Sequence, residues 1–218
     1  MAENIKTAVI TGGHSFDVLG FHKLFRGLAG IDAYIQHIDD FASSKEPVRD
    51  SYDVALFYFF MQDGPTDEGQ PWYAGKHKSA LEHLGETQQG IVVMHHALLA
   101  YPRWPVWSEI VGIEKRSFNY YHSETVPVTV ANVAHPITRG LGGWEMIDET
   151  YAMPDAGPGS EILLTTTHPK SMHTLAWTRT YKNARVFCFE SGHDNRTYVN
   201  PSFQTVLTRG IRWATRKI

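Results

Sequence analysis

Short apolar runs rich in β-branched residues alternate with amphipathic segments through the first half of the chain. The first run covers residues 7–11 and ends in Gly12-Gly13-His14, and residues 17–28 then carry apolar side chains at helical spacing. Similar runs follow at residues 33–38, 52–60 and 91–94. Continuous apolar runs of this length are typical of strands buried on both faces of a parallel sheet. The alternation therefore predicts right-handed βαβ units.

The second half of the chain has a different pattern. Four further runs are typical of strands, at residues 126–130, 162–166, 175–181 and 185–190. The last two flank Lys182-Asn183, a pair that favours a hairpin turn. A final helix is expected after Asn200, which can cap it, with Pro201 in its first turn. We predict an α/β fold in one domain over residues 1–218, with a mostly parallel sheet, helices on both faces and an antiparallel hairpin at one edge.

The composition excludes several classes of protein. The formal net charge is −3 and no basic run is present, so a nucleic-acid partner is not expected. The first residues lack the pattern of a signal peptide, and no apolar stretch approaches the roughly 18 residues of a membrane span. We expect a cytoplasmic protein that does not bind membranes. Gly12-Gly13 completes neither phosphate-binding glycine pattern, so no nucleotide cofactor is expected.

Cys188 is the only cysteine, which excludes an internal disulfide and a cysteine-based zinc site. It lies inside a predicted strand between two phenylalanines, whereas a nucleophile must project from a sharp turn. No serine lies in a G-x-S-x-G elbow either. Covalent catalysis by cysteine or serine is therefore not expected.

The chain has 12 histidines, and several of them directly follow predicted strands. His14 follows the first strand, His95 and His96 follow the strand at 91–94, and His193-Asp194 comes after the last strand. Open parallel sheets bind ligands beyond the carboxyl ends of their strands, so these side chains are expected to share one edge. Imidazole is the commonest metal ligand in proteins. We predict a pocket in which His14, His96 and His193 bind a zinc-like divalent ion.

Residues for proton transfer and for substrate binding complete the predicted site. His95 and His96 are candidates for the acid or base, and so are Glu149 and Asp194. Glu149 is also a candidate for a fourth metal ligand, and it is equally consistent with a solvated loop carboxylate. Gly13 would let a ligand approach the backbone closely. Aromatic faces beside polar groups suit sugar rings but can also close a core, and the candidates are Tyr101, Trp104 and Tyr121.

Several stretches, taken in order, resemble the trehalose-utilisation (ThuA-like) family. They are residues 11–14 (TGGH), 52–54 (YDV), 90–95 (GIVVMH), 135–141 (HPITRGL), 148–151 (DETY), 176–179 (AWTR), 192–194 (GHD) and 209–213 (RGIRW). The resemblance implies a flavodoxin-related, class I glutamine amidotransferase-like fold. In amidotransferases the nucleophilic cysteine occupies the turn after a central strand, and this sequence has Met94-His95-His96-Ala97 there. The resemblance thus implies the scaffold without glutaminase chemistry, and a role with trehalose or related disaccharides through their oxidised 3-keto forms.

These observations leave two main hypotheses about function. The first is a sugar-active enzyme whose histidine-lined, metal-bearing site catalyses isomerisation, elimination or hydrolysis of a small carbohydrate. The second is a non-catalytic module that binds a carbohydrate or a sugar-derived metabolite and needs no metal. An acyl or amide hydrolase is a third hypothesis, which the missing nucleophile disfavours. The sequence makes no prediction about the oligomeric state.

Overall fold

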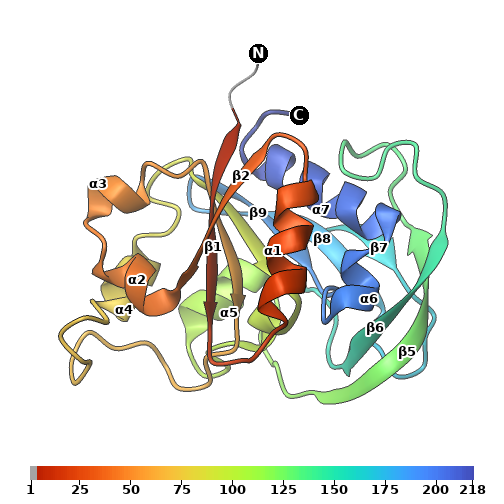
Figure 1. The fold of residues 1–218 in the computed structure, drawn as a ribbon. Coiled ribbons are helices and arrows are strands. Elements are labelled where there is room, and N and C mark those ends of the chain that lie inside the picture. The colour runs from red at the N-terminus through yellow and green to blue at the C-terminus, as the bar shows by residue number, and fades with distance from the viewer. Residues whose placement is uncertain (1–3) are drawn as a thin grey trace.

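A nine-stranded mixed sheet forms the centre of the computed structural model, which describes residues 4–218 (Figure 1). The strand order is β2-β1-β3-β4-β9-β8-β7-β5-β6. Five strands run parallel, namely β2 (Ile31–His37), β1 (Ile5–Gly12), β3 (Val54–Phe59), β4 (Gly90–Met94) and β9 (Ala184–Phe189). The remaining strands pair antiparallel, namely β8 (Thr174–Tyr181), β7 (Glu161–Thr165), β5 (Asn119–Val130) and β6 (Trp144–Ala152).

The predicted α/β class is confirmed, but the prediction of a mostly parallel sheet with one antiparallel edge hairpin is wrong. β9 pairs parallel with β4 and antiparallel with β8, so it divides the sheet into a parallel half and an antiparallel half. The antiparallel half is larger than a hairpin because β5 and β6 form a long ribbon at its edge. β5 is exposed along much of its length, and β6 carries Asp148-Glu149-Thr150 at its centre. Neither strand therefore has the continuous apolar run that marks a buried strand.

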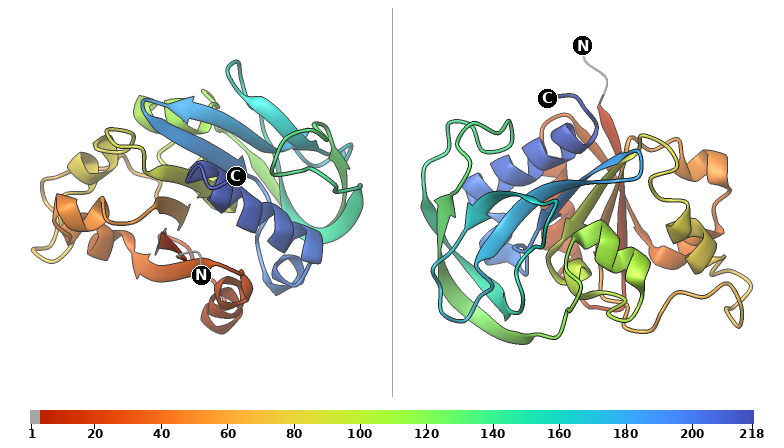
Figure 2. Two further views of the ribbon diagram at one scale, coloured as in Figure 1. Left: turned by 90° about the horizontal axis from the view of Figure 1, so that it is seen from above. Right: turned by 180° about the vertical axis from the view of Figure 1, so that it is seen from behind.

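Helices cover both faces of the sheet, as predicted (Figure 2). One face carries α1 (Val18–Gly27), α6 (Asn195–Tyr198) and α7 (Pro201–Ala214). The other carries α2 (Ile38–Ser43), α4 (His77–Glu82) and α5 (Pro105–Val111). α3 (Glu46–Arg49) buries none of its residues, and the 3₁₀ helix η1 (His95–Leu99) follows β4 directly. Each face of the sheet therefore has its own apolar core.

α7 shows how closely the helices approach the sheet. Asn200 caps the helix by accepting the backbone N–H groups of Ser202 (3.0 Å) and Phe203 (3.1 Å). A Cβ atom on Gly210 would lie 2.1 Å from the ring of Phe187, so only glycine permits this approach of α7 to β9. The predicted stripe on this helix is buried, at Phe203, Val206, Leu207, Ile211 and Ala214. α7 is thus packed closely against β9 of the parallel half.

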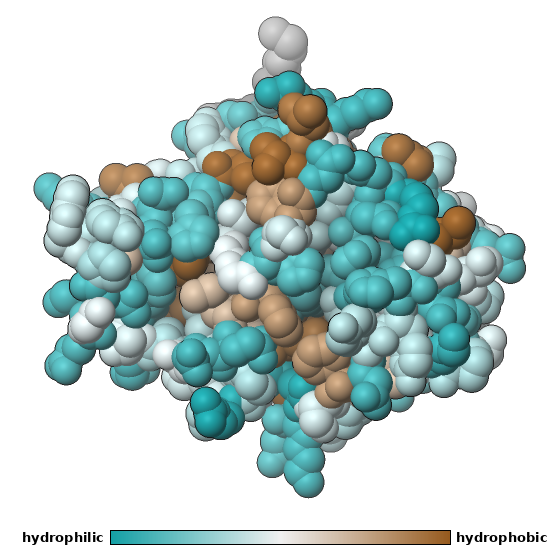
Figure 3. Space-filling model, turned by 60° about the horizontal axis from the view of Figure 1, so that its bottom comes forward, coloured by the Kyte–Doolittle hydropathy of each residue, from teal (hydrophilic) through white to brown (hydrophobic). Residues whose placement is uncertain are grey.

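The parallel strands end at the edge of the sheet that lies at the bottom in Figure 1. Figure 3 turns this edge toward the viewer and shows apolar side chains gathered among hydrophilic ones. None of the helices within residues 4–218 is long and apolar enough to cross a membrane. The carboxyl-end edge is where a ligand is expected in a sheet of this kind.

Candidate functional site

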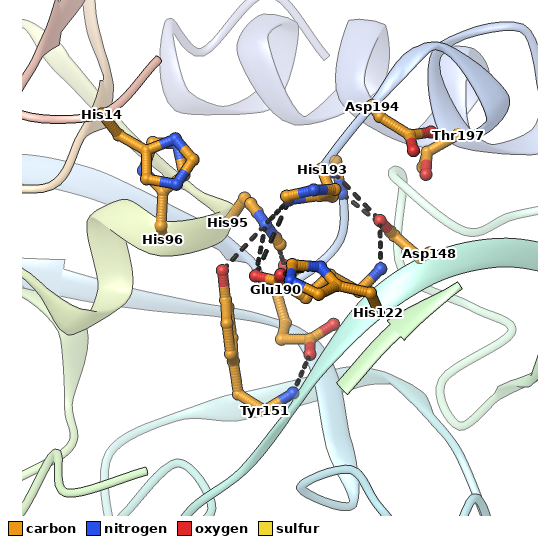
Figure 4. Close-up of polar contacts among 12 residues, drawn as sticks. His14, His95, His96, His122, Asp148, Tyr151, Glu190, His193, Asp194 and Thr197 are labelled. Atoms are coloured by element: carbon orange, nitrogen blue, oxygen red, sulfur yellow. Dashed lines mark hydrogen bonds and ion pairs between the residues drawn. The ribbon is translucent and has the colours of Figure 1, made fainter. Parts of the chain in front are cut away.

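Three strand ends of the parallel half bring their histidines together. The ring centroids of His14 and His96 are 4.5 Å apart, and those of His95 and His193 are 5.3 Å apart. The rings of His14 and His193 are separated by 6.4 Å. His193 joins this group because the last strand is parallel to the others, as the pairing of β9 with β4 shows. Figure 4 shows the His14–His96 pair on one side of a second group around His95 and His193.

His95 has the most constrained position of these histidines. It follows β4 with a φ of 55°, a left-handed conformation that is uncommon outside glycine and is often found at functional sites. Its side chain is fully buried, and its Nδ1–H donates to the carbonyl of Glu190 at 2.7 Å. This bond fixes the tautomer and leaves Nε2 as an acceptor facing the site, where the hydroxyl of Tyr151 lies at 2.8 Å.

His95, Glu149 and His193 have the spacing of metal ligands. His95 Nε2 lies 3.2 Å from His193 Nδ1 and 3.5 Å from Glu149 Oε1, and His193 Nδ1 lies 3.6 Å from the same carboxylate oxygen. Ligand atoms at 2.0–2.1 Å from a tetrahedral zinc ion are separated by roughly 3.3–3.4 Å, from the geometry of the tetrahedron. The three measured distances bracket this value. Two imidazole nitrogens and one carboxylate oxygen are also a donor set found in catalytic zinc sites.

A β-bulge places a further histidine against Glu149. Tyr121 pairs with Thr150 and Glu124 with Asp148, so His122 and Ser123 together lie opposite Glu149. Ser123 takes a φ of 60° at this irregularity, and the Nδ1 atom of His122 lies 2.6 Å from Glu149 Oε2. Bulges bend a strand and redirect its side chains, and they are common beside active sites. One oxygen of Glu149 therefore faces His95 and His193, while the other is paired with His122.

Asp148 holds the loop that carries His193. This buried carboxylate accepts the backbone N–H groups of Gly192 (2.8 Å), His193 (2.9 Å) and Glu149 (2.9 Å). The hydroxyl of Tyr58 donates to the carbonyls of Gly192 and His193 at 3.1 and 3.2 Å. Burial raises the pKa of Asp148, although its hydrogen bonds and the charge of His95 act in the opposite direction. Asp148, in the antiparallel half, therefore positions His193, which follows a strand of the parallel half.

The electrostatics of the cluster favour a cation. Burial raises the pKa of Glu149, but the contacts of its carboxylate with His95 and His193 outweigh burial and lower the pKa to about 2. Burial and the neighbouring His95 lower the pKa of His193 to about 4. At neutral pH the site thus presents an anionic carboxylate beside a neutral imidazole, which are the protonation states that bind a metal ion.

A cavity of about 250 Å³ opens beside this cluster. Histidines and aromatic rings line most of it, and the lining residues are His14, Phe60, His96, Leu99, Phe118, Tyr120, His122, Glu149 and Tyr151. His96 donates from Nδ1 to the carbonyl of Phe59 at 3.2 Å, and its buried Nε2 has no hydrogen-bond partner among the described residues. Burial and the charges of His95 and His14 keep the pKa of His96 well below its usual value. Its ring is therefore neutral and offers an acceptor beside the cavity.

Other residues predicted for the site lie elsewhere. Asp194 caps α6 through the N–H of Arg196 (2.8 Å) and forms an ion pair with that side chain, away from the histidines (Figure 4). Tyr121 has the ammonium of Lys170 over its ring at 5.2 Å and does not line the cavity. Trp104 packs against Tyr101, with ring centroids 5.6 Å apart, in the apolar core on the face of the sheet that carries α2, α4 and α5.

Gly13 and Tyr101 line a neighbouring pocket instead of the histidine cavity. Cys188 is fully buried, and burial raises the pKa of its thiol, as expected for a structural residue. The aromatic residues that do line the histidine cavity are Phe60, Phe118, Tyr120 and Tyr151. Aromatic side chains therefore line the cavity, but they come from other positions than those predicted.

Sequence reasoning missed His122, Asp148 and Tyr151 as site residues. The stretch Asp148-Glu149-Thr150-Tyr151 was singled out for Glu149 alone, because it was not assigned to a strand. In β6 the whole stretch is buried, and a run of acidic residues between Ile147 and Tyr151 was the available signal. His122 had no local signal, since its direction depends on the bulge opposite Glu149.

Comparison with known proteins places this fold. Residues 48–214 match the ThuA family, described as trehalose utilisation. A ThuA-like protein from Parabacteroides merdae aligns with a TM-score of 0.70 and 21% identity over 99% of this chain and 91% of that one. A cytoplasmic protein from Salmonella typhimurium aligns with a TM-score of 0.68 and 11% identity over 96% and 98%. A glutamine amidotransferase from Thermotoga maritima aligns with a TM-score of 0.53 and 9% identity over 96% and 98%.

At these identities the structural likeness establishes the fold alone, and no curated protein matches the chain in sequence. The family match is independent of that likeness and spans well over half of the chain. Its residues include β3, β4, β6 and β9, which carry the clustered side chains or end beside them. The protein therefore belongs to the ThuA (trehalose utilisation) family and has a glutamine amidotransferase-like α/β fold.

Proposed function

We propose that this protein is a cytoplasmic, sugar-active enzyme of disaccharide utilisation. Its substrate would be trehalose or a related disaccharide, in a 3-keto form, and its cofactor a zinc-like divalent ion held by His95, Glu149 and His193. The observation that carries the proposal is the tetrahedral spacing of these three ligand atoms beside an aromatic-lined cavity. His14 and His96, which were predicted as ligands or catalysts, would instead contact the substrate from the cavity wall.

A divalent ion at this position would polarise a sugar carbonyl or stabilise the enediolate formed from it. The residues around it supply the proton transfers. Because Glu149 Oε2 is paired with Nδ1 of His122, the other nitrogen of that exposed ring is free to take or give a proton. Burial and the charge of Glu149 keep the pKa of Tyr151 well above its usual value, so its hydroxyl stays a donor. This arrangement supports isomerisation, elimination or hydrolysis next to a carbonyl.

The walls of the cavity are suited to a carbohydrate. Phe60, Phe118 and Tyr120 offer ring faces or edges to the apolar side of a sugar. His96 presents an unpartnered buried nitrogen that can accept from a sugar hydroxyl. His14 donates from Nδ1 to the carbonyl of Ser15 at 2.7 Å, which leaves its Nε2 as a second acceptor. Stacked rings and paired acceptors are the combination by which sites orient polyhydroxylated ligands.

The decisive experiment combines metal analysis with turnover. Elemental analysis of the purified chain should find about one divalent transition ion per molecule. Incubation with 3-keto-trehalose should consume it, incubation with trehalose should not, and a chelator should abolish turnover until zinc is returned. Turnover that survives removal of the metal would overturn the metal-assisted chemistry. Tight sugar binding with no turnover of either form would establish the non-catalytic binding module.

A further inference from the structure

The histidine cavity has a neighbour on the other side of Phe60. This second pocket has a volume of about 420 Å³ and is lined in part by Gly13, Phe60, Gln70, His77 and Tyr101. We propose that it is a second sugar subsite, which binds the ring of the disaccharide that does not react. The inference rests on the proposed function and extends it, because it assigns the substrate two rings and gives the second ring a place.

The size of the histidine cavity favours such an extension. Ligand pockets typically enclose about 300–1,000 Å³. The histidine cavity, at about 250 Å³, lies below this range. The two pockets share Phe60, and Gly13 of the second is the chain neighbour of His14 of the first. The two pockets therefore lie side by side, and we infer that a ligand of two rings spans them past Phe60.

Gly13 lets the two pockets lie this close together. Its φ is 68°, and a Cβ atom at this position would lie 2.4 Å from the carbonyl oxygen of Phe60. Any other residue would push the loop after β1 away from the end of β3 and separate the walls. Gly13 was predicted to bind substrate, and we infer that it does so by bringing these two backbones together.

Tyr101 gives the second pocket its clearest sign of a ligand. The residue is 1% exposed, and its hydroxyl has no hydrogen-bond partner among the described residues. Its backbone takes a φ of 47°, held by a bond from its N–H to the carbonyl of Met61 (2.6 Å) and by the buried guanidinium of Arg116 on its own carbonyl (2.6 Å). A buried hydroxyl without a partner is destabilising, so a rigidly held one in a pocket wall indicates a group that arrives with the ligand.

His77 complements this hydroxyl. The ring is buried, and its Nε2–H donates to Asp39 Oδ1 at 2.8 Å, which fixes the tautomer and leaves Nδ1 as an acceptor. Tyr101 is thus a donor and His77 an acceptor in the wall of the same pocket. A sugar hydroxyl both accepts and donates, so this pair matches it, while Phe60 and Met61 offer apolar surface to the ring.

The test compares the binding of trehalose and glucose to the full-length chain by titration calorimetry. The wild type should bind trehalose more tightly than glucose. Tyr101→Phe removes only an unpartnered hydroxyl, so the fold should survive, and Kd for trehalose should rise roughly 3- to 10-fold as one hydrogen bond is lost. Kd for glucose should change less than about twofold. Tyr181→Phe, a tyrosine of the same core beyond the other end of the strands, is the matched control.

A second variant blocks the pocket sterically. A Cβ atom on Gly64 meets no heavy atom within 4 Å, so Gly64→Trp can be accommodated and should also weaken trehalose binding selectively. Equal Kd values for trehalose and glucose in the wild type, or unchanged trehalose binding in both variants, would overturn the subsite while the histidine site stands. A wild type that binds and converts no sugar at all would instead refute the proposed function, and the subsite with it.

Discussion

The two halves of the sheet contribute to the site in different ways. In the parallel half, His14, His95 and His193 lie just beyond the ends of buried strands, where the chain leaves the sheet. In the antiparallel half, Glu149 and His122 lie inside strands and reach the site across a bulged ribbon. The cluster forms only where β9 joins the halves. Function on this scaffold therefore depends on the register of an edge ribbon as much as on strand ends.

The largest effects should come from removing one ligand from either half. His193→Ala in the parallel half and Glu149→Gln in the antiparallel half should each lose the bound ion and lower kcat/KM by more than about 100-fold. The effect should be this large because mutating even a residue that only hydrogen-bonds to a metal ligand lowers metal affinity or activity about 10- to 100-fold. Metal content per chain and turnover of 3-keto-trehalose measure this. His22→Ala on α1 and Glu145→Gln, an exposed position on β6 itself, are the controls. A Glu149→Gln protein that keeps its ion would show that the parallel half alone makes the site.

A smaller effect should follow from loosening the link between the halves. In the wild type, the two oxygens of Asp148 accept the backbone N–H groups of Gly192 and His193. Asp148→Asn keeps one acceptor oxygen, but its amide N–H₂ group would face the other backbone N–H and could not accept from it. We expect metal affinity to fall 10- to 100-fold and the free energy of unfolding to fall by about 1–3 kcal/mol. Denaturant unfolding and competition with a chelator report the two quantities.

Asp155→Asn is the matched control for that variant. Asp155 also accepts a backbone N–H, that of Thr174 at 2.7 Å, but lies outside the cluster. It should lose some stability and no metal affinity. If both variants bind the ion equally well, Asp148 supports the fold and does not position His193.

The parallel half could be predicted from sequence because its signals are local. Each buried strand is a continuous apolar run, and its end is marked by the glycine or polar residue that follows. Three histidines at such ends were enough to predict one shared edge, although their division into a His95–His193 group and a His14–His96 pair was not predicted. That division depends on which backbone carbonyl each ring engages, that of Glu190 for His95 and that of Phe59 for His96, and no local pattern encodes it.

The antiparallel half was largely missed because its signals are non-local. β5 is half exposed, and β6 buries a carboxylate pair whose desolvation is offset mainly by groups distant in sequence. The sequence pattern predicts a loop for such residues, because charged side chains are rarely buried without a partner. The aromatic residues were misplaced for a similar reason. Tyr101 and Trp104 were predicted to bind substrate in the histidine cavity, but Tyr101 lines the neighbouring pocket and Trp104 packs against the apolar core.

A substitution at Cys188 tests whether the residues of β9 that face the apolar core, and not the site, matter for activity. Its thiol is fully buried and donates to the carbonyl of Val111 at 3.9 Å. Cys188→Ser should therefore cost about 1–2 kcal/mol of unfolding free energy, because a buried hydroxyl lacks a close partner. Turnover should be unchanged, and iodoacetamide should not modify the native thiol. Loss of turnover in a folded variant would restore a thiol mechanism.

The smallest effect concerns a histidine of the antiparallel half that has a structural environment. His135, in the connection between β5 and β6, packs on Trp213 and accepts the N–H of Ile137 at Nδ1 (3.2 Å). Burial lowers the pKa of His135, and the charge of Arg185 adds to this against the opposing charge of Glu161. The unfolded chain therefore takes up a proton more readily than the folded one below pH of about 6.5, and stability should decline as the pH falls below that value. His135→Gln removes this contribution, so its stability deficit relative to the wild type should narrow between pH 8 and pH 5. Urea unfolding of both proteins across that range measures the difference in unfolding free energy, to which the other histidines contribute equally in the two proteins. If the two curves of unfolding free energy against pH are parallel, His135 titrates alike in the folded and unfolded chains.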